Sequence, residues 1–147
     1  MRIIGIGNPL MGDDGIGIAA VSALEKEGVP EGVEIIDGGT GGLTLLTLME
    51  GAKRVILVDA VETGRKPGTI LRLAGEDLEP ETAASSLSLH SSGLPEVLAL
   101  GRALGTLPPL ILFGVQPDSV EVRLGLSELV AAALPPLLAL IREELKA

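Results

Sequence analysis

The sequence contains no cysteine, no tryptophan and no tyrosine, and Phe113 is its only phenylalanine. Without cysteine, the chain has no disulfides, no thiolate zinc site and no cysteine nucleophile. It also lacks the aromatic platforms on which single-stranded nucleic acids stack. Basic residues are few: the sequence has 11 lysines and arginines against 20 acidic residues, which gives a formal net charge of −9. A charge of this sign argues against nucleic acid or an anionic membrane as the partner.

Long hydrophobic runs are absent as well. No stretch reaches the roughly 20 apolar residues of a membrane-spanning helix, and the longest candidate, 129–141, is interrupted by Pro135 and Pro136. Nothing near Met1 has the pattern of a signal peptide, so we expect a cytoplasmic protein. The 147 residues, 46% hydrophobic and 21% charged, predict a single globular domain over residues 1–147.

Short apolar runs alternate with helical patterns along most of the chain. The run 54–59 is apolar without alternation, which is typical of a strand buried on both faces. This order of strands and helices predicts an α/β domain with a mostly parallel sheet and right-handed crossovers. The expected strands are 2–6, 33–37, 54–59 and 110–115, and the expected helices are 14–28, 43–50 and 93–104.

Four further segments are less regular. Residues 69–73 predict an edge strand that can run antiparallel, and 75–89 predict a long loop. Residues 119–124 fit an extended segment or a short edge strand. Ser127 and Glu128 begin a final helix, which Pro135 and Pro136 should kink or break.

A glycine-rich turn at 5–17 joins the first strand to the first helix. Its spacing matches neither a dinucleotide-binding fingerprint nor a Walker A loop. Asp13 and Asp14 also stand at the helix N-terminus, where a phosphate would meet like charge. This end of the sheet therefore favours a cation. The structural alternative is that Asp13 caps the helix and Asp14 is a favourable first-turn charge, together worth about 1 kcal/mol.

Asp59 and His90 follow later strands. Asp59 ends the apolar run 54–59, and His90, the only histidine, lies among serines before a helix. Each has a structural alternative, since Asp59 can be a turn or cap residue and His90 a hydrogen-bonded loop residue. If the loops after the strands share one edge of the sheet, Asp14, Asp59 and His90 converge. Two carboxylates and one imidazole suit zinc or nickel and do not select between them.

The segment 37–42 contains Asp37, four glycines and Thr40. Glycines after a strand allow a sharp turn or give clearance for another chain, so this segment is either a flexible loop or a place where an extended peptide can lie. Alone it is a weak signal.

Together these residues resemble the [NiFe]-hydrogenase maturation endopeptidases. The resemblance rests on the glycine–asparagine–acidic block at 5–17, on 37–40, on 58–60 and on His90 before a helix. It implies a three-layer α/β/α fold around about five strands. It also implies an enzyme that removes the C-terminal extension of the hydrogenase large-subunit precursor once nickel has been inserted. The catalytic, metal-contacting residues would then be Asp14, Asp59 and His90, and the substrate-binding residues Asp37, Gly38, Gly39, Thr40 and Gly41.

On this interpretation nickel arrives with the precursor and is not held permanently, and zinc or another divalent ion can substitute for it in vitro. Asp13 and Asp37 are candidates for a general base. Two alternatives stay open. One is a nickel-binding accessory protein without peptidase activity, and the other is a peptidase or amidase of the same fold with another client.

Overall fold

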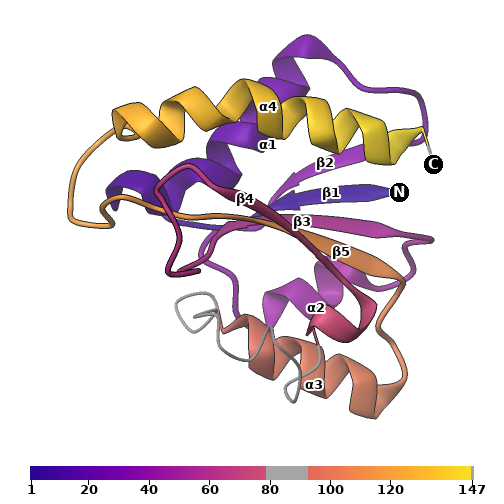
Figure 1. Ribbon diagram of the computed structural model, residues 1–147. Helices are drawn as coiled ribbons and strands as arrows, with labels where there is room; N and C mark the ends of the chain where they lie inside the picture. The colour runs from indigo at the N-terminus through magenta and orange to yellow at the C-terminus, as the bar shows by residue number, and fades with distance from the viewer. Residues whose placement is uncertain (79–92, 147) are drawn as a thin grey trace.

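The computed structural model describes residues 1–78 and 93–146. It shows a central sheet with helices on both faces (Figure 1). The strands are β1 (Arg2–Gly5), β2 (Glu34–Asp37), β3 (Val55–Ala60), β4 (Ile70–Ala74) and β5 (Leu110–Val115). The helices are α1 (Ile16–Glu27), α2 (Thr44–Met49), α3 (Leu94–Leu104) and α4 (Glu128–Leu145), with the short 3-10 helices η1 (Gly12–Gly15) and η2 (Gly75–Leu78).

The sheet has five strands in the order β2-β1-β3-β5-β4. The pairs β1·β2, β1·β3 and β3·β5 are parallel, and the edge strand β4 runs antiparallel to β5. The predicted α/β class, the mostly parallel sheet and the antiparallel edge are therefore confirmed. The chain leaves β1 toward β2 on one side and continues through β3 on the other. The carboxyl ends of β1 and β3 therefore mark the point where the strand order reverses.

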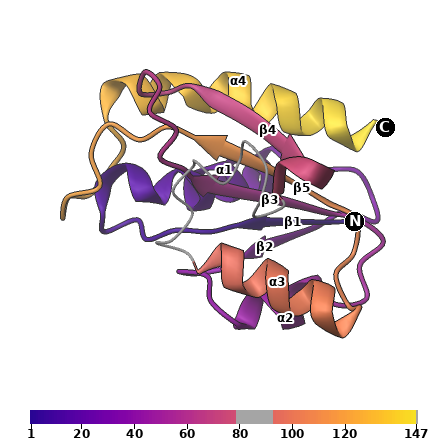
Figure 2. The ribbon, with the colours of Figure 1, turned by 60° about the horizontal axis from the view of Figure 1, so that its bottom comes forward.

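Helices α1 and α4 cover one face of the sheet, and α2 and α3 cover the other (Figures 1 and 2). Alternate residues of β3 divide between the two cores. Ile56 and Val58 pack with α1 and α4, whereas Val55 and Leu57 pack with α2 and α3. All six residues of β3 are buried, as expected for a central strand of a parallel sheet covered on both faces.

Helix α1 packs unusually close to the strand ends. A Cβ added to Gly17 would lie 2.3 Å from the carbonyl oxygen of Val58 and 2.4 Å from that of Ile6. Only glycine permits this approach, so Gly17 sets the distance between α1 and the carboxyl ends of β1 and β3. The η1 turn that precedes α1 is thereby held against the same edge.

Helix α4 runs through Pro135 and Pro136 without interruption, so of the predicted kink or break the break does not occur. Both prolines lie on the exposed side, and the carbonyls that lose a partner belong to the exposed residues Ala131 and Ala132, where water can hydrate them. The opposite side is buried on the sheet through Val130, Ala133, Leu137, Leu138 and Ile141. Burial of this many apolar side chains outweighs the cost of about 3 kcal/mol for an internal proline.

Two other expectations are changed by the structure. Residues 119–124 form no strand and make one isolated bridge, between Met11 and Arg123. Residues 75–78 of the expected long loop form η2, and the remainder of that loop lies outside the described residues. Across the described ranges, no helix combines the length and apolarity needed to cross a membrane.

Candidate functional site

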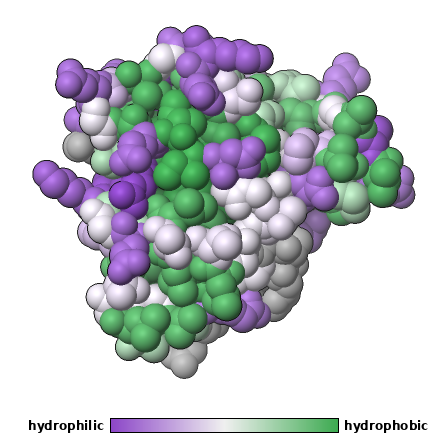
Figure 3. All heavy atoms as spheres, turned by 180° about the vertical axis from the view of Figure 1, so that it is seen from behind, coloured by the Kyte–Doolittle hydropathy of each residue, from purple (hydrophilic) through white to green (hydrophobic). Residues whose placement is uncertain are grey.

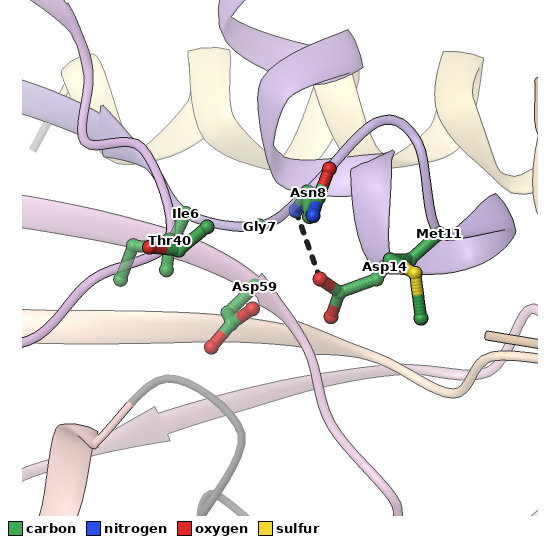
Figure 4. A pocket seen from close by; sticks show the side chains of 7 residues that line it. All are labelled: Ile6, Gly7, Asn8, Met11, Asp14, Thr40 and Asp59. Carbon is green, nitrogen blue, oxygen red and sulfur yellow. Dashed lines mark hydrogen bonds between the residues drawn. The ribbon is translucent and has the colours of Figure 1, made fainter. Parts of the chain in front are cut away.

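A pocket of about 170 Å³ lies where the strand order reverses, at the carboxyl ends of β1 and β3. Open α/β sheets bind their ligands at such a position. The pocket has room for a metal ion with several water-sized groups. Two acidic residues line it, Asp14 from η1 and Asp59 from the end of β3, and their carboxylates meet at this one pocket (Figure 4). The described residues that line it are Ile6, Gly7, Asn8, Met11, Asp14, Thr40 and Asp59.

Asp14 is oriented by the turn that precedes it. It lies in η1 and is partly exposed, and its Oδ2 accepts a hydrogen bond of 2.8 Å from the backbone N–H of Asn8. The side-chain Oδ1 of Asn8 in turn accepts the N–H of Leu10 at 2.9 Å, which stabilises the turn. Within the described part of the chain, Oδ1 of Asp14 accepts no hydrogen bond. This oxygen can therefore serve as a ligand while Oδ2 holds the carboxylate in place.

Asp59 is the fifth residue of β3, and 1% of it is exposed. Its neighbours Val58 and Ala60 pack with α1 and α4, so strand alternation directs Asp59 to the face covered by α2 and α3. A carboxylate this deeply buried at the end of an apolar strand is rare unless it is hydrogen-bonded or coordinates a metal. The interpretation of Asp59 as a mere turn or cap residue is wrong, because it lies within the strand.

Asp13 points away from the pocket, and the expectation that it caps α1 is wrong. The N-cap residue of α1 is Gly15, which makes no side-chain cap hydrogen bond, and the first turn of α1 has no acidic residue. Asp13 is fully buried, and its carboxylate accepts hydrogen bonds from three backbone N–H groups and one hydroxyl. The donors are the N–H of Asp118 at 2.8 Å, of Ser119 at 3.1 Å and of Ser127 at 2.7 Å, and Oγ of Ser127 at 2.7 Å.

Burial by itself raises the pKa of Asp13, but the hydrogen bonds from the Ser127 hydroxyl and from the three backbone N–H groups outweigh it. The pKa of this carboxyl therefore lies below its usual value. A carboxylate that is buried, ionised and committed to four donors is a poor proton acceptor. Asp13 is therefore a structural residue that fastens residues 118–127 to η1, and it is unsuited to the role of general base.

The segment 37–41 follows β2 and is attached to the end of β1. The N–H of Gly38 donates to the carbonyl of Gly5 at 2.7 Å, and the N–H of Gly7 donates to the carbonyl of Gly39 at 2.8 Å. The exposed Asp37 accepts the N–H of Gly39 at 2.8 Å and does not line the pocket. Among Asp37, Gly38, Gly39, Thr40 and Gly41, the pocket is lined by Thr40. The structure therefore places this loop at the rim of the pocket.

His90 lies outside the described residues, so the third member of the expected ligand set stays a prediction. Among residues 1–78 and 93–146, no three histidine, aspartate or glutamate side chains gather closely enough to hold a metal ion. The two carboxylates of the pocket nevertheless have the donor chemistry of a divalent-cation site.

Asn8 and Met11 also line the pocket, and sequence reasoning did not assign them a role. The Asn8-Pro9 pair is a typical turn signal and could have indicated the bond that orients Asp14. Met11 carries no comparable signal, because its place depends on a long-range pairing. Its bridge to Arg123 spans more than a hundred residues of sequence.

This doubly wound domain, with two carboxylates at its reversal point, has the fold of known hydrogenase maturation endopeptidases. One solved structure, the hydrogenase maturating endopeptidase HybD from Escherichia coli, has a TM-score of 0.86 and 36% identity, and the match covers 99% of this chain and 91% of that one. A family model described as hydrogenase maturation protease matches residues 18–144.

Two curated relatives agree with this result. The hydrogenase 2 maturation protease of Escherichia coli K12 is 39% identical over 139 residues, which are 92% of this chain and 84% of the relative. The hydrogenase expression/formation protein HupD of Bradyrhizobium diazoefficiens is 39% identical over 121 residues, 81% of this chain, and the match spans only 63% of the relative's length. The chain belongs to the hydrogenase maturation protease family.

Proposed function

We propose that this protein is an endopeptidase that removes the C-terminal extension of a [NiFe]-hydrogenase large-subunit precursor after nickel insertion. The partner is the nickel-loaded precursor, which Asp14, Asp59 and His90 recognise through its metal. The observation that carries this proposal is that Asp14 and Asp59, 45 residues apart in the sequence, line one pocket at the reversal point of the sheet. Family membership supports the class of reaction.

The electrostatics of the pocket favour a cation over an anion. Among the described residues that line it, Asp14 and Asp59 are acidic and none is a lysine or arginine. Oxygen and imidazole donors suit nickel or zinc, and neither carboxylate alone would hold the ion firmly. Nickel therefore belongs to the substrate in this proposal, and an incomplete ligand set in the enzyme makes recognition depend on a loaded precursor. Zinc or another divalent ion can occupy the same donors in vitro.

His90 joins the proposal through its place in the sequence. Asp59 is directed to the face of the sheet covered by α2 and α3, and α3 begins four residues after His90. We therefore propose its imidazole as the third ligand on the grounds of sequence position and family resemblance. Nickel at this position would polarise a peptide carbonyl and make a bound water more acidic.

We assign the tail of the precursor to the loop at 37–41. This loop forms the rim of the pocket beside Asp14 and Asp59, and its Thr40 side chain lines the pocket. Asp37 holds the turn through Gly39, and the glycines leave room for an extended backbone to pass. A peptide lying here would present its scissile bond to the two carboxylates.

The test is the intact mass of the cognate large-subunit precursor after incubation with this protein, with and without nickel in the precursor. We expect loss of one defined C-terminal fragment from the loaded precursor alone. Asp14→Asn, Asp59→Asn and His90→Ala should each slow the reaction by at least about a hundredfold, since the first two remove a charged donor and the third removes the imidazole. Glu25→Gln, an exposed acid on α1, is the matched control and should retain full activity.

The alternatives give different results in the same experiment. A nickel-binding accessory protein would bind the metal in proportion to its concentration and leave the precursor's mass unchanged. A peptidase or amidase with another client would cleave unrelated peptides and ignore nickel in the precursor. Full activity of the His90→Ala protein would contradict the three-ligand arrangement.

A further inference from the structure

Four exposed apolar side chains lie beside the pocket on two segments that are bonded to each other. They are Leu10 at 59% exposure, Val120 at 46%, Val122 at 82% and Leu124 at 77%. We call these four side chains the apolar ridge. The loop that carries three of them projects at the left of Figure 1, and in the reverse view of Figure 3 apolar atoms gather on the part that projects at the right.

The two segments of the ridge are held together by backbone hydrogen bonds. The N–H of Arg123 donates to the carbonyl of Leu10 at 2.9 Å, and the N–H of Gly12 donates to the carbonyl of Arg123 at 2.9 Å. The N–H of Asp13 adds a bond of 2.9 Å to the carbonyl of Ser119. Leu10 and residues 119–124 therefore form one surface, although they are more than a hundred residues apart in sequence.

Hydrogen bonds to a buried side chain also hold both ends of the loop that carries most of the ridge. The buried carboxylate of Asp13 accepts the N–H groups of Asp118 and Ser119 at one end of the loop, and the N–H and hydroxyl of Ser127 at the other. Both ends of the loop are therefore fixed, and the apolar side chains are displayed to solvent.

The ridge adjoins the pocket through residues of the same turn. Leu10 belongs to the ridge, Met11 lines the pocket and pairs with Arg123, and Asp14 supplies a carboxylate to the pocket. A folded protein that brings a metal and its own C-terminal segment to Asp14 and Asp59 must lie over this rim. The two surfaces are continuous, so a molecule that enters the pocket would also meet the ridge.

We propose that the apolar ridge is the docking surface for the folded body of the large-subunit precursor, which covers it with an apolar patch next to its metal. This inference rests on the proposed function, because that function supplies the partner. Recognition is thereby divided: the pocket contacts the metal and the tail, and the ridge contacts the folded protein that carries them. Apolar exposure of this kind beside a site commonly marks a protein interface.

The experiment compares binding and cleavage of the nickel-loaded precursor by three proteins. The first is the wild type, the second is the double variant Val122→Asp/Leu124→Asp, and the third is the control Leu104→Asp. Leu104 is 61% exposed at the end of α3 and is therefore matched in type and exposure. Binding is measured by biolayer interferometry with the immobilised precursor, using forms that also carry Asp59→Asn so that cleavage does not remove the ligand. Melting temperatures establish that all three proteins are folded.

We expect the ridge variant to weaken binding at least tenfold and to raise KM for cleavage by a similar factor, with kcat little changed and the control equal to wild type. A short peptide that spans the cleavage junction lacks the folded body, so any activity toward it should be the same in all three proteins. Equal affinity of the ridge variant and wild type for the precursor would overturn the inference, as would an absence of wild-type binding. Binding that depends on the ridge without any cleavage would support the inference and contradict the proposed peptidase function.

Discussion

Replacing Asp13 with asparagine should destabilise the protein strongly, although the side chain keeps its size. The carboxylate accepts four hydrogen bonds at 2.7–3.1 Å, three at Oδ2 and one at Oδ1. Asparagine can place its carbonyl oxygen at the Oδ2 position, but its NH2 group then faces the N–H of Ser127. One buried donor loses its acceptor, and three charge-assisted bonds become neutral ones.

The magnitude follows from these contacts. An unsatisfied buried donor costs about 1–3 kcal/mol, and a hydrogen bond to a charged group exceeds a neutral one by about 1 kcal/mol. We therefore expect Asp13→Asn to lower the free energy of unfolding by about 3 kcal/mol or more. For a chain of this length that corresponds to a fall in Tm of roughly 6–12 °C.

Urea unfolding followed by far-ultraviolet circular dichroism is the suitable assay, because the chain has no tryptophan to report by fluorescence. The control is Asp118→Asn, which alters an exposed aspartate in the same loop and should change stability by less than about 0.5 kcal/mol. An Asp13→Asn protein within about 1 kcal/mol of wild type would refute the idea that this carboxylate fastens residues 118–127.

Further predictions concern pH and packing. Hydrogen bonds lower the folded-state pKa values of both Asp13 and Glu144. These two carboxylates therefore stabilise the fold above a pH of about 4, and their contribution is lost as the pH falls through the lowered pKa values. The free energy of unfolding, measured as a function of pH in this acid range, should fall less steeply in Asp13→Asn than in the wild type. Glu144→Gln breaks the ion pairs to Arg54 and Arg72. It should lower the free energy of unfolding, measured by urea unfolding, by about 1 kcal/mol at low salt and by less at high salt. Gly17→Ala should lower the free energy of unfolding by at least about 2 kcal/mol, because its Cβ would lie 2.3 Å from a backbone oxygen. The control is Gly101→Ala, whose Cβ would meet side-chain atoms at 3.0 Å and which should therefore be tolerated; thermal melts of both variants make the comparison.

The lowered pKa of Glu144 has a cause that also positions α4. The hydrogen bond from Arg72 has the largest effect, burial opposes it, and Arg54 adds a second hydrogen bond. Arg54 precedes β3 and Arg72 lies in β4, so one carboxylate near the end of α4 joins the helix to two strands. Arg54 also donates to the carbonyl of Glu144 at 3.0 Å.

The fold was largely predictable because its signals are local. The unbroken apolar run at 54–59 could only be a buried strand, and its observed bounds differ by one residue. Where a long-range contact decided the outcome, local reasoning failed. Residues 119–124 have the alternation of a strand, yet the bonds to Asp13 and to the segment at 10–12 hold them as a loop.

The candidate site was predicted in part for the same reason. Asp14 and Asp59 come together because carboxyl ends of parallel strands share an edge, a rule that needs only the order of elements. The role of Asp13 could not be predicted from the sequence, because a carboxylate just before a helix is usually interpreted as its N-cap. Its actual partners lie 105 to 114 residues further along the chain. His90 is the member of the set that stays a prediction.

The short η1 turn limits where this protein can place the carboxylate that lines the pocket from this turn. A 3-10 turn has three residues per revolution, so neighbouring side chains diverge by about 120°, and Asp13 and Asp14 point to the interior and to the pocket respectively. The acid cannot be moved one position back, because that place is occupied by the anchor of the 118–127 loop. It cannot be moved one position forward either, since a Cβ at Gly15 would lie 2.8 Å from the Cα of Pro9. Among positions 13 to 15, a library screened for relocated activity should therefore return the acid at position 14 alone.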